Sequence, residues 1–168
     1  MNGVIWRPVR RETSVERPFD QIRSYLSANP STVLGDLPVS LHVRRAGLDI
    51  SRDIRVERGD LEVGSHVVRI PLEWSDSRRP ELCPVLESTL EVTPQIMAPP
   101  SATRFDLAGH YRLPFGPFGV AVAALVGHRL LLESVDRFLA SLVRRLELEL
   151  PPEPATHVAP AFGSRQER

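Results

Sequence analysis

Few residues in this sequence combine reactive side chains with apolar surroundings. His128 stands in a long apolar segment, and Tyr111 and Ser88 occupy apolar positions of alternating segments earlier in the chain. An imidazole in such surroundings can donate a hydrogen bond or act as a general base, and a hydroxyl can donate to a ligand oxygen. For two of them we expect a structural role to be the commoner one: His128 would bond a strand carbonyl or lie near the rim, and Tyr111 would pack with its hydroxyl at the surface. Ser88 would either mark a ligand contact or make room for the helix. An acid–base role requires these groups to lie within reach of one another.

The composition excludes several other kinds of chemistry. All 21 basic residues are arginine, so no lysine is present for a Schiff base or a P-loop. The single cysteine, Cys83, excludes an internal disulfide and a thiolate zinc cluster, and it favours a cytoplasmic location. His42, His66 and His110 show no metal-binding spacing, so we expect neither a metal nor another cofactor.

The charge balance and the apolar segments limit the partners. Basic and acidic residues number 21 each, which gives no net field to attract nucleic acid or an anionic membrane. The longest mostly apolar stretch, residues 115–126, is shorter than the roughly 20 residues of a membrane span and contains Gly and Pro. Residues 1–11 lack the apolar core of a signal peptide. We therefore expect a soluble protein.

The first part of the chain predicts one strand and two short helices. Residues 4–16 alternate loosely, as a strand with Pro8 at an edge or bulge. Residues 18–27 have apolar positions at helical spacing after a proline, which favours a helix start. Residues 30–35 predict a second short helix, with Asn29 as its cap.

After Pro38 the pattern changes to a period of two for about 75 residues, which predicts about five further strands. One side of each strand is apolar and the other is charged, as in an antiparallel sheet with one covered face. In the segment 66–74 this alternation places His66 on the same side as Val68 and Ile70. From residue 118 to about 148, apolar residues recur at three- and four-residue intervals and predict a helix about 45 Å long. This helix would cover the sheet. Residues 1–149 then form one α+β domain, and the proline-rich residues 150–168 form a disordered tail.

This order of elements resembles that of the START and Bet v 1-like superfamily, also called the SRPBCC or polyketide cyclase/dehydrase and lipid transport group. The sharper match is the segment GHYRLPFGPFG, residues 109–119, followed by GHR at 127–129. It is similar to the last strand and helix start of bacterial SRPBCC proteins, many of them actinobacterial. The resemblance implies a helix-grip fold, in which a curved antiparallel sheet of about six or seven strands wraps a long C-terminal helix. It also implies a cavity for a lipid, sterol, polyketide or hormone.

We predict that this cavity is lined by apolar residues of the strands and the helix, although cores use the same residue types. Trp74 would be either a flat wall for a ring system or a core residue. The predicted ligand-binding residues are Val68, Ile70, Leu72, Trp74, Leu90, Phe105, Leu107, Tyr111, Val122, Leu125, His128, Val135 and Phe138.

Three functions remain open from the sequence. The leading hypothesis is a carrier or sensor of a hydrophobic small molecule, such as a lipid, acyl or polyketide-type ligand. The alternative is a cyclase- or dehydratase-like enzyme that uses His128 with Tyr111 or Ser88. The third is a protein-interaction module without a ligand. The charged outer faces show no broad apolar patch that would favour the third hypothesis.

Overall fold

The structure is a computed structural model, and it describes residues 6–29, 39–45, 48–75, 85–95, 102–112 and 120–152. For residues 39–45, 48–54, 75, 120–127 and 130 it describes the backbone without the side chains. The helix predicted at 30–35 and most of the predicted tail lie outside the described residues.

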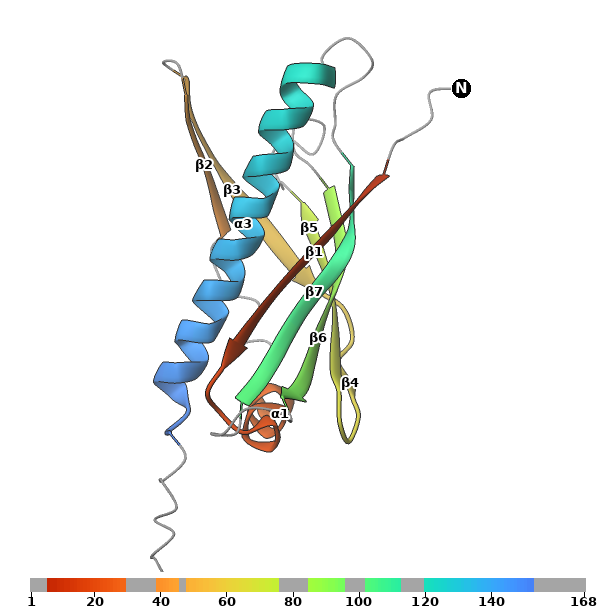
Figure 1. Ribbon diagram of the computed structural model, residues 1–168, viewed down its shortest axis with the longest axis vertical. Coiled ribbons are helices and arrows are strands. Elements are labelled where there is room, and N and C mark those ends of the chain that lie inside the picture. The colour runs from red at the N-terminus through yellow and green to blue at the C-terminus, as the bar shows by residue number, and fades with distance from the viewer. Residues whose placement is uncertain are drawn as a thin grey trace, which may run out of the picture.

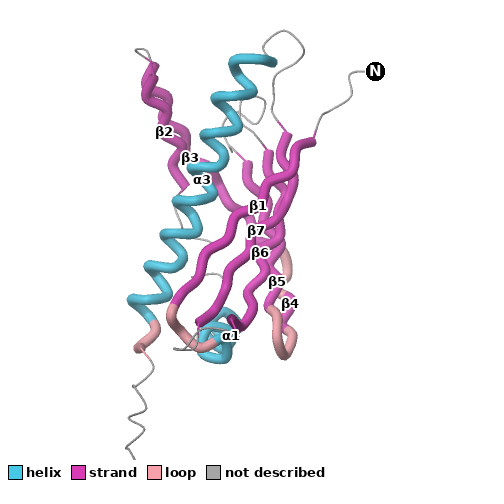
Figure 2. Tube along the Cα trace, viewed as in Figure 1, coloured by secondary structure: helices cyan, strands magenta, loops and turns pink. Residues whose placement is uncertain are grey.

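The described residues form an antiparallel sheet, a short helix and a long helix (Figures 1 and 2). The strands pair in the order β1-β7-β6-β5-β3-β2, and β4 pairs with β5 beside this path. The elements in chain order are β1 (Trp6–Val15), α1 (Phe19–Ala28), β2 (Val39–Arg45), β3 (Leu48–Arg58), β4 (Glu62–Val63), β5 (Val68–Ser75), β6 (Val85–Gln95), β7 (Ala102–Arg112) and α3 (Val120–Glu149).

The sheet curls around α3, because the helix contacts both β1 and β2, which lie at opposite ends of the strand order. Figure 1 shows α3 running along the sheet, with α1 at one end of the strands. A helix that touches both edges of one sheet must lie on its concave side. The predicted helix-grip fold, α+β with a curved antiparallel sheet around the C-terminal helix, is confirmed.

The concave face is built by the apolar side of the alternating pattern. Strand register brings equivalent positions of β5, β6 and β7 into cross-strand rows. All the side chains of these rows except Gly109 are buried. The rows are Val68–Val92–Phe105, Ile70–Leu90–Leu107, Leu72–Ser88–Gly109 and Trp74–Leu86–Tyr111.

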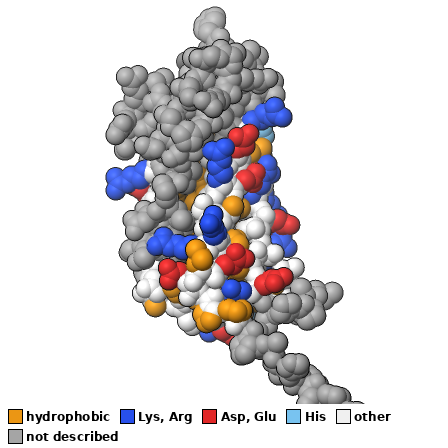
Figure 3. Space-filling view, turned by 90° about the vertical axis from the view of Figure 1, so that its left-hand side faces the viewer, with side chains coloured by type: hydrophobic (Ala, Val, Ile, Leu, Met, Phe, Trp, Pro, Cys, Tyr) orange, Lys and Arg blue, Asp and Glu red, His pale blue; other side chains and the backbone are white. Residues whose placement is uncertain are grey.

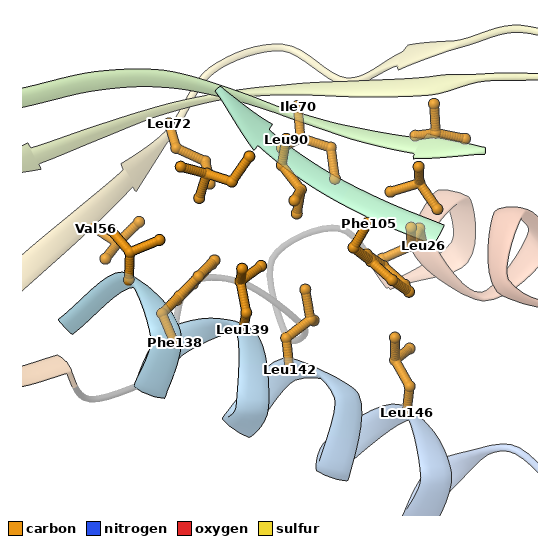
Figure 4. Close-up of a cluster of buried hydrophobic side chains, with 14 of the residues drawn as sticks. Leu26, Val56, Ile70, Leu72, Leu90, Phe105, Phe138, Leu139, Leu142 and Leu146 are labelled. Atoms are coloured by element: carbon orange, nitrogen blue, oxygen red, sulfur yellow. The ribbon is translucent and has the colours of Figure 1, made fainter. Parts of the chain in front are cut away.

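The long helix supplies the opposing layer of the core. Leu131, Val135, Phe138, Leu142 and Leu146 are each at most 1% exposed, and their spacing of three to four residues places them on one face of α3. Figure 4 shows the labelled helix residues directed toward the strand residues. Full burial of one such side chain contributes about 1.5–3 kcal/mol, so this seam is a main source of stability.

Several predicted boundaries agree with the structure, and one prediction is wrong. The first strand and first helix lie where the pattern placed them, and Pro8 is on an edge strand. His66, however, does not extend the inward face of β5. The chain reverses between Val63 and Val68, which pair across a turn closed by Gly64 N–H donating to Val67 O at 2.8 Å. His66 is therefore an exposed turn residue.

The convex face of the sheet is charged. Asp106 of β7 accepts hydrogen bonds from Arg10 of β1, and Arg69 of β5 donates to Glu91 of β6 at 2.7 Å. The hydrogen bond and the charge of Asp106 raise the pKa of Arg10, and Glu91 acts in the same way on Arg69. Figure 3, which shows another face of the molecule, has basic and acidic side chains interspersed with small apolar areas.

No helix in the described parts of the chain combines the length and the apolar character needed to cross a membrane.

Candidate functional site

Tyr111 and His128 form a polar pair between the sheet and the long helix. The Tyr111 hydroxyl oxygen lies 2.6 Å from His128 Nδ1, and the two rings are nearly parallel, with centroids 5.7 Å apart at an angle of 25°. Tyr111 is 0% exposed, whereas His128 is partly exposed. The pair therefore runs from the protein interior toward its surface.

The fold explains why these two residues meet. Tyr111 is the second-last residue of β7 and belongs to the inward-facing half of that strand. His128 precedes Leu131 and Val135 by three and seven residues, which places all three on the same side of α3. Because β7 is followed by α3 along the chain, the end of the strand lies near the N-terminal half of the helix. The sequence pattern placed both residues inward and left Tyr111 and Ser88 open as the partner of His128.

Trp74 lies in the same cross-strand row as Tyr111, with Leu86 between them. It is 1% exposed and packs edge-on against Phe138 of α3, with ring centroids 5.1 Å apart at an angle of 66°. Such an arrangement is favourable for aromatic rings. Among the described side chains, Trp74 Nε1 is one of two buried polar atoms without a hydrogen-bond partner.

Ser88 does not join the polar pair. Its hydroxyl donates to Leu72 O across the neighbouring strand, at 3.4 Å. Ser88 is opposite Gly109, which has no side chain, so the β6–β7 end of this row carries little side-chain volume. Of the two residues considered as partners for His128, the structure brings Tyr111 within hydrogen-bond distance and leaves Ser88 in the next row.

Apart from His128, the predicted lining residues fall into two groups. Those of the strands, together with Val135 and Phe138, are buried on the facing surfaces of sheet and helix. Val122 and Leu125 lie in the part of α3 where only the backbone is described, so their side chains are outside the described set. Leu86 was not among the predicted site residues, although it separates Trp74 from Tyr111. Leu86 alternates with Ser88 and Leu90 along β6, and this pattern could have identified it as an inward-facing residue.

A metal ion has no candidate ligands in the described part of the chain, where no cluster of three or more His, Cys, Asp or Glu side chains occurs. A partly exposed ion pair lies at the edge of the sheet. Arg11 of β1 and Asp136 of α3 lie 3.0 Å apart, which links the edge strand to the helix.

Comparisons with known proteins agree with the fold. No family model matches this sequence. No curated protein matches it either. A structure of a norcoclaurine synthase point mutant from Thalictrum flavum, in complex with a transition-state analogue, is similar over 85% of this chain and 97% of its own, with a TM-score of 0.50 and 13% identity.

Two further solved structures have lower scores. A protein from Thermus thermophilus is similar over 86% of this chain and 100% of its own, with a TM-score of 0.45 and 16% identity. The Zhui aromatase/cyclase from a Streptomyces species is similar over 86% of this chain and 93% of its own, with a TM-score of 0.40 and 13% identity.

The architecture is the helix-grip fold, and the norcoclaurine synthase structure shares it. The fold that the resemblance implied is thus confirmed.

Proposed function

We propose that this protein binds a hydrophobic small molecule between the concave face of the sheet and α3, as a carrier or sensor. The inward faces of β5, β6 and β7 are almost entirely apolar, as small-molecule sites usually are. The fold also supports this class of function, because the norcoclaurine synthase structure holds a transition-state analogue. The single cysteine supports a cytoplasmic location for this activity.

The observation that carries the proposal is the Tyr111–His128 pair at the end of this apolar surface. Ligand sites combine carbon-rich walls with a few placed polar groups that fix the orientation of the ligand. Because His128 uses Nδ1 to contact Tyr111, a ligand oxygen would contact its other ring nitrogen, Nε2. His128 is the partly exposed member of the pair, whereas Tyr111 is buried.

The same pair favours a second candidate function, a cyclase- or dehydratase-like enzyme. When Nδ1 carries the proton, its N–H donates a hydrogen bond to the Tyr111 oxygen. Nε2 then has a free electron pair and can accept a proton from a substrate. Tyr111 would then hold the imidazole in the basic tautomer. The hydrogen bond supports this reading because an acid–base mechanism needs an oriented imidazole, but a carrier can use the same pair as an anchor.

The third hypothesis, a protein-interaction module, has no comparable support among the described side chains. The large apolar side chains that are exposed there are Trp6, Val63 and Leu148, on three separate elements. Scattered exposed apolar residues are ordinary on protein surfaces.

Extraction of the purified protein with organic solvent, followed by mass spectrometry, tests the proposal. We expect an apolar molecule to co-purify with the wild-type protein in a near-stoichiometric amount. A double variant, Ser88→Trp with Leu90→Trp, would fill the concave face and should abolish the co-purification. Absence of any extracted molecule, together with no binding of apolar fluorescent probes, would overturn the proposal.

A second experiment separates the carrier from the enzyme. The extracted molecule is incubated with wild-type protein and with His128→Ala, and its mass is followed over time. A carrier leaves the mass unchanged in both samples. An enzyme changes it in the wild-type sample alone, while the variant still binds the molecule.

A further inference from the structure

We infer that the ligand carries a neutral hydrogen-bond acceptor oxygen, of the carbonyl type, that accepts the indole N–H of Trp74. This inference rests on the proposed function and specifies the chemical class of the ligand. It follows from the burial, surroundings and position of Trp74.

The Trp74 N–H is a buried donor without an acceptor. The side chain is 1% exposed, and Nε1 has no hydrogen-bond partner in the described part of the protein. A buried donor that has left water without gaining an acceptor costs free energy. A phenylalanine would supply an aromatic ring at this position without that cost, so packing alone does not account for an indole.

The surroundings of Trp74 are apolar and hold its ring in place. Its strand neighbours are Val56 of β3 and Leu86 of β6, and its ring meets Phe138 of α3 edge-on. All three neighbours are apolar and buried. The ring is therefore held between sheet and helix, and its N–H is a preorganised donor on the surface that we propose for the ligand.

The same surroundings define the acceptor. An indole nitrogen only donates, so the ligand atom must accept. A carboxylate would bring a buried charge, and Val56, Leu86 and Phe138 offer no cation to compensate it. A neutral carbonyl oxygen meets both conditions.

The position of Trp74 also indicates the shape of the ligand. Trp74 and Tyr111 are two strands apart in one row, and strands lie about 4.8 Å apart, so their Cα atoms are separated by about 10 Å. A ring system lying over Leu86 would have the Trp74 donor at one end and the Tyr111–His128 pair at the other. The geometry thus favours a flat apolar molecule with an oxygen near one end.

The test compares two probes of similar size, 2-acetylnaphthalene and 2-ethylnaphthalene, by isothermal titration calorimetry. Only the first has a carbonyl oxygen. The ratio of their Kd values is measured in wild-type protein and in Trp74→Phe. We expect the preference for the acetyl compound to fall by about 3- to 10-fold in the variant, the amount that one neutral hydrogen bond provides.

Two controls guard this measurement. Trp6→Phe removes an indole N–H from the 40% exposed tryptophan and should leave the ratio unchanged. If Trp74→Phe fails to fold, replacement of Trp74 by benzothienylalanine, in the Trp6→Phe background, removes the N–H while keeping the size of the ring.

An unchanged ratio in either Trp74 variant overturns the inference and leaves the proposed function intact. Failure of both probes to bind the wild-type protein, with no co-purifying molecule, overturns the proposed function and the inference together.

Discussion

Gly109 of β7 lies opposite Ser88 of β6, and the two strands approach so closely there that a Cβ atom on Gly109 would be 2.6 Å from both Cα and Cβ of Ser88. It would be closer still to the carbonyl oxygen of Glu87. Because two of these three atoms belong to the backbone, no side-chain rotation can relieve the contact. This approach sits in the row next to the one that holds Trp74 and Tyr111.

Gly109→Ala should therefore destabilise the protein by about 1–3 kcal/mol, the usual cost of forcing extra atoms into a packed region. Chemical denaturation gives the free energy of unfolding. Ala108→Ser, at the exposed neighbouring position on β7, is the control and should change stability by less than about 0.5 kcal/mol. Equal stability of Gly109→Ala and the wild type would show that the strands can separate at this point without cost.

Removal of the Tyr111 hydroxyl should release His128. Tyr111→Phe deletes one partner of the 2.6 Å contact and keeps the buried ring. We expect a loss of about 0.5–1.5 kcal/mol in the free energy of unfolding, and a change in the nitrogen chemical shifts of His128, because the hydrogen bond sets its tautomer. Tyr25→Phe removes the other tyrosine hydroxyl of the chain and should leave these shifts unchanged. Identical His128 shifts in both variants and the wild type would contradict the pair.

Phe138 should be one of the most costly residues of α3 to truncate. It is 1% exposed and packs against Trp74, so Phe138→Ala removes both apolar burial and an aromatic contact. The expected loss is about 3–5 kcal/mol, with a red shift of Trp74 fluorescence measured in a Trp6→Phe background. Arg137→Ala changes an exposed residue of the same helix and should have little effect. A loss below about 1 kcal/mol for Phe138→Ala would place the ring outside the core.

Arg17 should hold the C-terminal end of α3. Its Nε donates to Leu150 O at 2.9 Å and its Nη2 donates to Glu147 O at 3.3 Å, so a residue just after β1 satisfies carbonyls at the helix end. Arg17→Ala should cost about 1–2 kcal/mol, because bonds from a charged donor are lost. Amide hydrogen exchange in the last turn of α3 should accelerate in Arg17→Ala. The control Arg144→Ala changes an exposed residue of the same helix, and exchange there should accelerate much less. Unchanged exchange in Arg17→Ala would contradict this role.

The sequence alone determined the elements and the faces that they bury. Strict alternation in β5, β6 and β7, and the three- and four-residue spacing in α3, are local consequences of backbone geometry, since side chains alternate along a strand and recur every 3.6 residues along a helix. The wrong placement of His66 has the same origin. Its position continues the alternation of β5, but the pairing of Val63 with Val68 puts it in a turn, and strand pairing is not a local property.

Only the tertiary structure decided which side chains meet. Tyr111 and His128 are 17 residues apart, and both were predicted to face inward, yet their hydrogen bond depends on how α3 crosses the end of β7. The same holds for Trp74 with Phe138 and for Arg17 with Leu150, which join segments far apart in the chain. The orphaned Trp74 N–H was also invisible in the sequence, because a hydrogen-bond donor is known to lack a partner only when its neighbours in space are known.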